Sequence, residues 1–119
     1  MNRIDILLKN KNNVLTIFFT AGYPKLEDTM PVLEKLQEEG VDMIEIGIPF
    51  SDPVADGPVI QKANLKAISN GMTVVKLFEQ IAGMRDKIII PVVIMSSLNP
   101  ILQYGMERFI ERCATVGID

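Results

Sequence analysis

The sequence predicts an α/β fold in which short parallel strands alternate with helices. Three short runs of apolar and β-branched residues are separated by segments whose apolar residues recur at helical spacing. The runs are almost continuously apolar, which is typical of parallel strands covered on both faces. Strand–helix alternation of this kind is the pattern of successive βα units.

The first half of the chain contains two of these units. A strand is expected over 14–19, followed by a helix that opens at residue 28 or 29 and ends at Gly40. A second strand is expected over 41–47. The prolines of the loop over 49–58 exclude regular structure there.

The second half begins with a helix that starts at Pro58, a residue suited to the first helical position. Thr73 is expected to cap a further helix. The third strand is expected over 88–95, with Pro91 weakening its first half. Asn99-Pro100 is interpreted as a turn. A last helix is expected to share one apolar face among Met106, Phe109, Ile110 and Cys113.

Two helix ends have similar sequences, Glu39-Gly40-Val41-Asp42 and Val116-Gly117-Ile118-Asp119. The first leads into a strand, so the second predicts the opening of a fourth strand. Residues 1–119 are therefore expected to be the N-terminal portion of a larger domain, truncated where strand 4 begins.

The composition excludes several classes of function. The chain has 119 residues, a formal net charge of −3 and no His. It lacks the basic surface that binds nucleic acid, and it has no His-ligated metal or His-dependent nucleophile. The lone Cys113 excludes a disulfide within the chain and a cysteine metal cluster. Acid–base chemistry therefore depends on carboxylates, Lys, Tyr or Cys113.

No segment predicts a membrane protein. The longest apolar run, 88–95, is interrupted by Pro91 and falls far short of the roughly twenty residues of a membrane span. The first residues carry interspersed charges instead of the apolar core of a signal peptide. These features predict a cytoplasmic protein.

Glu45 is a carboxylate inside an apolar strand. Alternation places Ile44 and Ile46 on one face and Glu45 on the other, near the carboxyl end where parallel α/β folds bind ligands. Glu45 is therefore a candidate catalytic acid or base. The alternative is a structural Glu45, paired with a buried Lys or Arg or lying at an edge of the sheet.

The loop after this strand adds Asp52 and Asp56. Its prolines make it stiff, so it is able to hold a carboxylate at a fixed place above the strand end. The alternative is that both residues only initiate turns, Asp52 before Pro53 and Asp56 before Gly57.

The run from Glu45 to Gln61, EIGIPFSDPVADGPVIQ, resembles the signature of the tryptophan synthase alpha subunit family. Phe19 to Pro24 and Asn99-Pro100-Ile101 with Tyr104-Gly105 match further segments of that family, and the resemblance extends over the whole chain. It implies an eight-stranded parallel (β/α) barrel of the TIM type. Residues 1–119 would supply about the first three of its eight βα units, as part of a single barrel domain.

The resemblance also implies an activity in tryptophan biosynthesis. The family cleaves indole-3-glycerol phosphate to indole and glyceraldehyde 3-phosphate by a retro-aldol reaction. Indole passes to the beta subunit of an α2β2 complex, and pyridoxal phosphate belongs to that subunit, so no cofactor is expected in this chain. Glu45 resembles the acid/base that protonates the indole ring, and Asp56 resembles the carboxylate that stabilises the charged ring nitrogen.

Other positions match residues that line the pocket or meet the partner. Phe18 resembles an aromatic of the indole pocket, and Ser97 stands where the family usually carries a Tyr. Asp52, Pro53 and Asn99 fall in segments that meet the beta subunit. The phosphate-binding loops of the family come from later strands, so the 119-residue chain alone is expected to be inactive. The alternative function is a non-catalytic fragment that binds the beta subunit or associates with itself.

Overall fold

The computed structural model describes residues 1–119, and its centre is one parallel sheet in the order β1–β2–β3. The strands are β1 Thr16–Thr20, β2 Met43–Gly47 and β3 Val92–Met95. The predicted α/β fold with parallel strands is confirmed. Pro91 precedes β3, so the first half of the run over 88–95 is not a strand, as its proline predicted.

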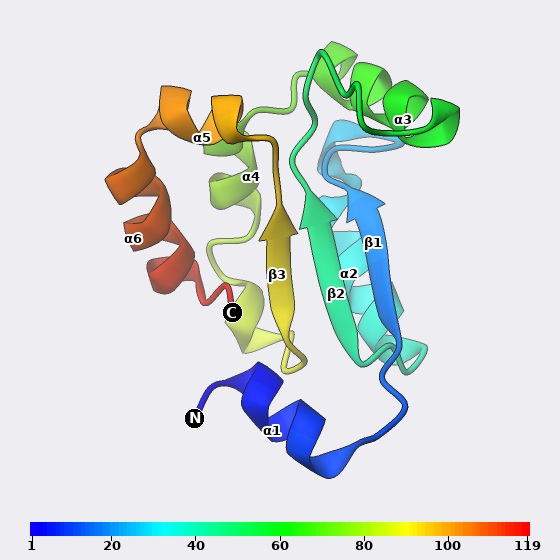
Figure 1. Cartoon of the computed structure of the whole chain (residues 1–119), viewed down its shortest axis with the longest axis vertical. Coiled ribbons are helices and arrows are strands. Elements are labelled where there is room, and N and C mark those ends of the chain that lie inside the picture. The colour runs from blue at the N-terminus through cyan, green and yellow to red at the C-terminus, as the bar shows by residue number, and fades with distance from the viewer.

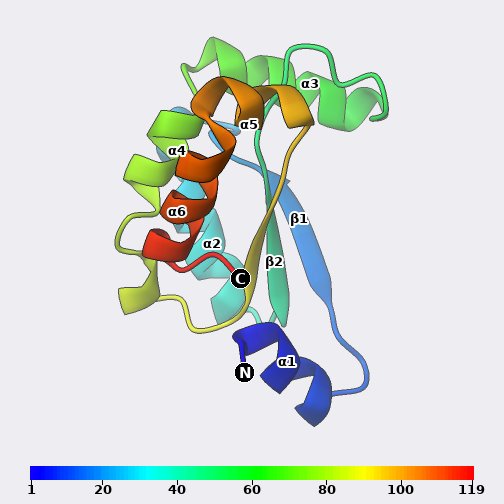
Figure 2. The ribbon, with the colours of Figure 1, turned by 60° about the vertical axis from the view of Figure 1, so that its left-hand side comes forward.

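Helices cover one face and both ends of this sheet. They are α1 Arg3–Asn10, η1 Leu26–Asp28, α2 Thr29–Glu38, α3 Pro58–Ser69, α4 Val74–Gln80, η2 Met84–Asp86, α5 Leu98–Tyr104 and α6 Met106–Val116. In Figure 1, α3 and α5 lie beyond the carboxyl ends of the strands and α1 lies beyond the amino ends. Figure 2 shows α2, α4 and α6 gathered on one side of the sheet, while the opposite face is open.

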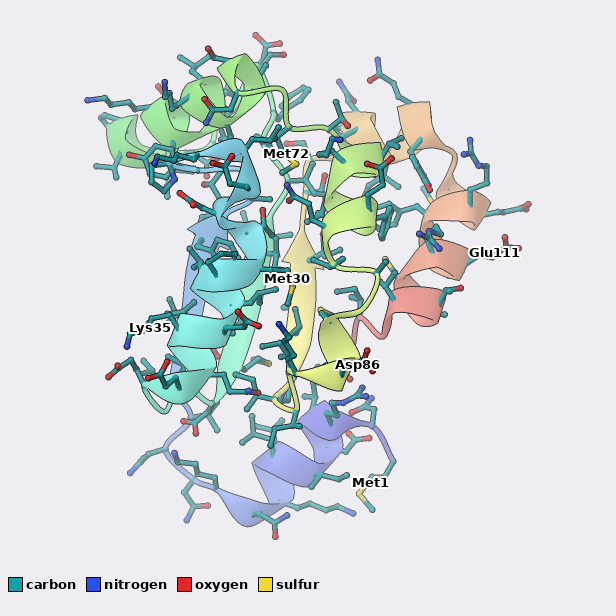
Figure 3. All side chains as sticks on the ribbon, turned by 180° about the vertical axis from the view of Figure 1, so that it is seen from behind. Met1, Met30, Lys35, Met72, Asp86 and Glu111 are labelled. Atoms are coloured by element: carbon teal, nitrogen blue, oxygen red, sulfur yellow. The ribbon has the colours of Figure 1, made fainter.

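The core lies between the sheet and these helices. Ile44, Ile46 and Val92 of the sheet are fully buried, as are Leu33 of α2 and Leu77 of α4. Burial of such a side chain stabilises the fold by roughly 1.5–3 kcal/mol relative to exposure. Figure 3 shows the helix layer from behind, with the labelled Lys35 and Glu111 projecting away from it.

Three aromatic rings join the helices near β3. Phe78 of α4 lies 5.5 Å from Tyr104 of α5 and 5.4 Å from Phe109 of α6, measured between ring centroids. The predicted apolar face of α6 is confirmed for Phe109, which is buried. It is wrong for Ile110 and Met106, whose side chains are exposed.

Two helices differ from the sequence prediction. Asn99-Pro100 is not a turn, because both residues belong to the first turn of α5. A proline is tolerated there, since the first N–H groups of a helix have no partner within it. Helix α1 was not predicted. It buries no residue completely, and Asn2 and Asp5 form a capping box at its start.

The similar helix ends form the same structure twice. Leu15 N–H donates to Asp42 Oδ2 (2.8 Å), and Asp42 N–H donates back to the Leu15 carbonyl (3.1 Å). In the same way Val92 N–H donates to Asp119 Oδ2 (3.0 Å), and Asp119 N–H donates to the Val92 carbonyl (2.8 Å). Each aspartate therefore ties the end of one βα unit to the start of its strand. The sheet has three strands, and Asp119 makes these bonds although it does not belong to a strand.

Cations bind the remaining oxygen of each aspartate. Lys11 Nζ lies 2.6 Å from Asp42 Oδ1, and Arg3 Nη1 lies 2.9 Å from Asp119 Oδ1. Because Arg3 is the first residue of α1 and Lys11 follows its last, these two ion pairs hold that helix across the amino ends of the strands. Arg85 adds a third ion pair, 2.6 Å from Asp119 Oδ2.

We predict that Asp42→Asn destabilises the chain at pH 7 but not at strongly acidic pH. The Leu15 N–H, and then Lys11, hold the pKa of Asp42 below its usual range. A depressed pKa adds stability above the unfolded-state pKa of about 3.9, and that stability is lost as pH falls through the folded-state value. Urea unfolding at pH 7 and pH 3 measures the difference.

The matched control is Asp86→Asn, because Asp86 is exposed and forms no ion pair. Its free energy of unfolding should change little at either pH. A loss of stability in Asp42→Asn that is equally large at pH 3 would contradict the assignment.

Candidate active site

Glu45 occupies the middle of β2 on the open face of the sheet. Its neighbours in register are Phe18 on β1 and Val93 on β3. The predicted alternation is confirmed, since Ile44 and Ile46 are fully buried under the helices while Glu45 is half-buried opposite them. The carboxylate forms no ion pair with any Lys or Arg of residues 1–119.

The loop that carries Asp56 is braced by the start of α3. Asp56 N–H donates to the Pro53 carbonyl (3.0 Å). The Gln61 side-chain Nε2 donates to the Asp56 carbonyl (2.8 Å) and to the Pro53 carbonyl (3.4 Å). These bonds fix the main chain and leave the half-buried Asp56 carboxylate without a partner in the chain.

A small cavity of about 30 Å³ lies above the carboxyl ends of the strands. It brings together three of the residues predicted for the site, Phe18, Asp56 and Ser97, whereas Glu45 lies lower on the sheet. Its lining combines apolar walls with carboxylate, amide and hydroxyl residues: Phe18, Gly47, Ile48, Phe50, Asp56, Ile60, Asn64, Met95, Ser96 and Ser97.

The other lining residues were not predicted from the sequence, and two of them, Gly47 and Asn64, stand out by residue type. A Cβ atom added to Gly47 would lie 2.4 Å from Cζ and 2.6 Å from Cε2 of Phe18, so the Phe18 ring rests directly on the Gly47 main chain. A glycine inside a strand is the signal that could have indicated such a close approach. Asn64 is a polar residue on the buried face of α3, between Ala63 and Ala67.

Asp52 and Asn99 lie in a different, larger cleft. This cleft has a volume of about 610 Å³ and lies between the loop after β2, the start of α4 and helix α5. Both side chains are exposed at its rim, and Tyr104 lies within it. Pro53, the third predicted partner residue, does not line the cleft, and its carbonyl is taken by Gln61.

The remaining groups with possible chemistry lie elsewhere. Cys113 is half-buried on α6, and this burial raises the pKa of its thiol, as expected for a core residue. No three His, Cys, Asp or Glu side chains gather closely enough to hold a metal ion. None of the helices has the length and apolar character needed to cross a membrane.

Sequence comparisons identify a family. The family model described as tryptophan synthase alpha chain matches residues 5–119. The tryptophan synthase alpha chain of Christiangramia forsetii is 56% identical over the whole of this chain, and that of Flavobacterium psychrophilum is 52% identical. This chain spans 46% and 47% of the length of those two relatives, so it corresponds to less than half of each.

Solved structures agree with the sequence comparisons. Tryptophan synthase subunit alpha from Legionella pneumophila str. Paris matches the whole chain with a TM-score of 0.94 at 38% identity, over 47% of its own length. Tryptophan synthase from M. tuberculosis, in its aminoacrylate-bound form, matches 99% of this chain with a TM-score of 0.88 at 29% identity, over 49% of its own chain. These neighbours establish the fold as the first three βα units of a (β/α) barrel.

We predict that Gly47→Ala displaces the Phe18 ring. The added Cβ occupies the space of two ring carbons, so the ring moves or the strands separate, at a cost of about 1–3 kcal/mol. Urea unfolding measures the stability, and the NMR chemical shifts of the Phe18 ring report its position. Gly57→Ala is the control, because nothing lies within 4 Å of a Cβ at that position. Equal stability of the two variants would contradict the packing described.

Proposed function

This chain belongs to the tryptophan synthase alpha chain family, and from that premise we propose that it provides part of an enzyme acting in tryptophan biosynthesis. The reaction is the retro-aldol cleavage of indole-3-glycerol phosphate to indole and glyceraldehyde 3-phosphate. The observation that supports it best is the arrangement of two carboxylates without partners, Glu45 on the open sheet face and Asp56 at the cavity above it.

In the proposed chemistry, Glu45 acts as acid and then as base. Its protonated carboxyl group gives a proton to the ring carbon that carries the glycerol phosphate chain, which places a positive charge on the ring nitrogen. The Asp56 carboxylate stabilises that charge through a hydrogen bond from the ring N–H. The carbon–carbon bond then breaks, its electron pair returns to the ring, and the side-chain hydroxyl loses its proton to Glu45 as the aldehyde forms.

We propose that residues 1–119 belong to a single (β/α)8 barrel domain. The support is the share of the relatives that this chain spans, 46–47%, together with the open face and free edges of its sheet. The family implies that the phosphate group is bound by later strands. The isolated chain is therefore expected to lack the lyase activity of the whole barrel.

The proposed partner is a tryptophan synthase beta subunit, in an α2β2 complex that receives the indole. Pyridoxal phosphate would belong to that subunit, and this chain would need no cofactor. Asp52 and Asn99, exposed at the rim of one cleft, support this surface as the point of contact. A cytoplasmic location is proposed with this biosynthetic role.

The test of the lyase proposal joins residues 1–119 to the C-terminal part of the Christiangramia forsetii relative, replacing the segment that matches this chain. Indole release from indole-3-glycerol phosphate is then measured. Glu45→Gln and Asp56→Asn should each lower kcat by about 10²–10⁴-fold, because each removes one carboxylate from the proposed chemistry.

Glu38→Gln is the matched control, since Glu38 is exposed on α2 and pairs only with Lys35 at the surface. It should keep the full rate. An active chimaera whose rate is unaffected by Glu45→Gln would refute the role of Glu45. Indole release by the 119-residue chain alone, abolished by Glu45→Gln, would refute its expected inactivity.

Binding of the 119-residue chain to a beta subunit tests the partner proposal. Asp52→Ala should weaken association about fivefold or more, because it removes a charged side chain from the proposed contact. Asp86→Ala changes another exposed aspartate, which does not line the cleft, and should leave the affinity unchanged. Calorimetric titration gives both values, and equal affinities would place the contact elsewhere.

A further inference from the structure

Asn70 and Gly71, at the end of α3, form the only Asn-Gly sequence in the chain. Each residue has a structural reason to be there. Gly71 has a φ of +98°, a left-handed value that glycine adopts without strain at the end of a helix. Asn70 holds the helix end in place through its side-chain amide. Together they form a chemically reactive pair, because glycine has no side chain to shield its main-chain nitrogen from the asparagine amide.

The Asn70 amide is bound to the loop after β1. Its Nδ2 donates to the Gly22 carbonyl (3.0 Å) and to the Pro24 carbonyl (2.9 Å). The junction is also tightly packed, because a Cβ atom added to Gly22 would lie 2.8 Å from Cβ of Met72. Met72 is buried, and its N–H donates to the Ala67 carbonyl (3.1 Å) at the end of the helix. Two hydrogen bonds and one close contact therefore fix the end of α3 to this loop.

Both residues of the pair are also accessible to solvent. Asn70 is half-buried and lines an open surface hollow of about 640 Å³ with Lys25, Glu27 and Lys66. Gly71 is exposed, and nothing lies within 4 Å of a Cβ atom at its position. Water therefore has access to both residues, and the main chain at Gly71 has space to move.

We propose that Asn70 is a site of spontaneous deamidation, at which water converts the amide to a carboxylate once the end of α3 opens. The Gly71 main-chain nitrogen, after losing its proton to hydroxide, forms a bond to Asn70 Cγ. The bond from Cγ to the side-chain nitrogen breaks, and that nitrogen leaves as ammonia. Water then adds to one of the two carbonyl groups of the cyclic imide and opens the ring to aspartate or isoaspartate.

The folded structure limits the rate of this reaction. Asn70 has helical main-chain angles, φ −72° and ψ −12°, and the Gly71 N–H donates to the Ile68 carbonyl (2.9 Å). The ring closes only after this turn unwinds and the amide leaves the Gly22 and Pro24 carbonyls. Deamidation therefore proceeds from a locally opened state and is slower than in an unfolded peptide.

The product is unable to rebuild the junction. A carboxylate has no proton to donate, so both hydrogen bonds to the Gly22 and Pro24 carbonyls are lost. Isoaspartate also adds a carbon to the main chain before Gly71, which disturbs the hydrogen bonds that end α3. The modification therefore releases the end of α3 from the loop after β1. This consequence does not depend on the proposed lyase function.

The reactivity is tested by ageing the 119-residue chain at mildly alkaline pH and mapping its asparagines by peptide mass spectrometry. In urea below the unfolding midpoint, Asn70 should react before any other asparagine. Without urea it should react at least about tenfold more slowly than a synthetic peptide of residues 64–76, a factor that two ordinary hydrogen bonds supply. Asn70→Gln is the control and should remove the product, because glutamine closes the corresponding ring far more slowly.

Two results would overturn the proposed site. The first is a reaction at the exposed Asn12 or Asn13 that precedes the reaction at Asn70, which would place the reactivity in the loop before β1. The second is an equal rate in the folded chain and in the peptide, which would show that the hydrogen bonds of Asn70 give no protection.

The structural consequence is tested on the deamidated chain, which ion exchange separates from the aged sample by its added negative charge. Hydrogen exchange at the Gly71 and Met72 amides should be about tenfold faster, or more, than in the unmodified chain. Asn70→Asp should show the same change without the isoaspartate component. Asn13→Asp is the matched control, since it adds the same charge at an exposed position. Equal exchange in the deamidated and unmodified chains would overturn the release of α3.

Discussion

The reciprocal hydrogen bonds between Leu15 and Asp42 set the register of β1 against β2, and the candidate site depends on that register. Once Leu15 is paired with Asp42, Phe18 lies beside Glu45, three residues further along each strand. Because side chains alternate along a strand, the same register sends Ile44 under the helices and leaves Glu45 on the open face. A slip of one residue would exchange these two environments, placing a carboxylate in the core.

Helix α3 connects the parts of the site that the sheet does not position. Its first turn holds the loop of Asp56 through Gln61, its buried face presents Asn64 to the cavity, and its end is tied by Asn70 to the loop after β1. The start of this helix is determined locally, by Pro58 at its first position. A short stretch of sequence therefore controls where the loop carboxylate lies relative to the strands.

The features that could be predicted from sequence are those with a local physical cause. The face of the sheet on which Glu45 lies follows from alternation alone. Asp56 was indicated by its place in the family motif that runs from Glu45 to Gln61. Helix α1 was missed; it is held by charges at its two ends and buries no side chain completely, so it adds no residue to the core pattern. Gly47 and Asn64 were missed because their partners are distant in sequence: Phe18 lies on another strand, and the cavity is built from four segments.

The cavity has two kinds of wall, and this division bears on what it is able to hold. Phe18 and Ile60 give it apolar surface, while Asp56 and Asn64 give it hydrogen-bonding groups. An aromatic ring with a single N–H donor needs both kinds of wall. The Phe18 ring lies against the Gly47 main chain, so it is unable to move towards that strand. Met95 lines the same cavity with an exposed, unbranched side chain, which is able to adapt its shape at little cost.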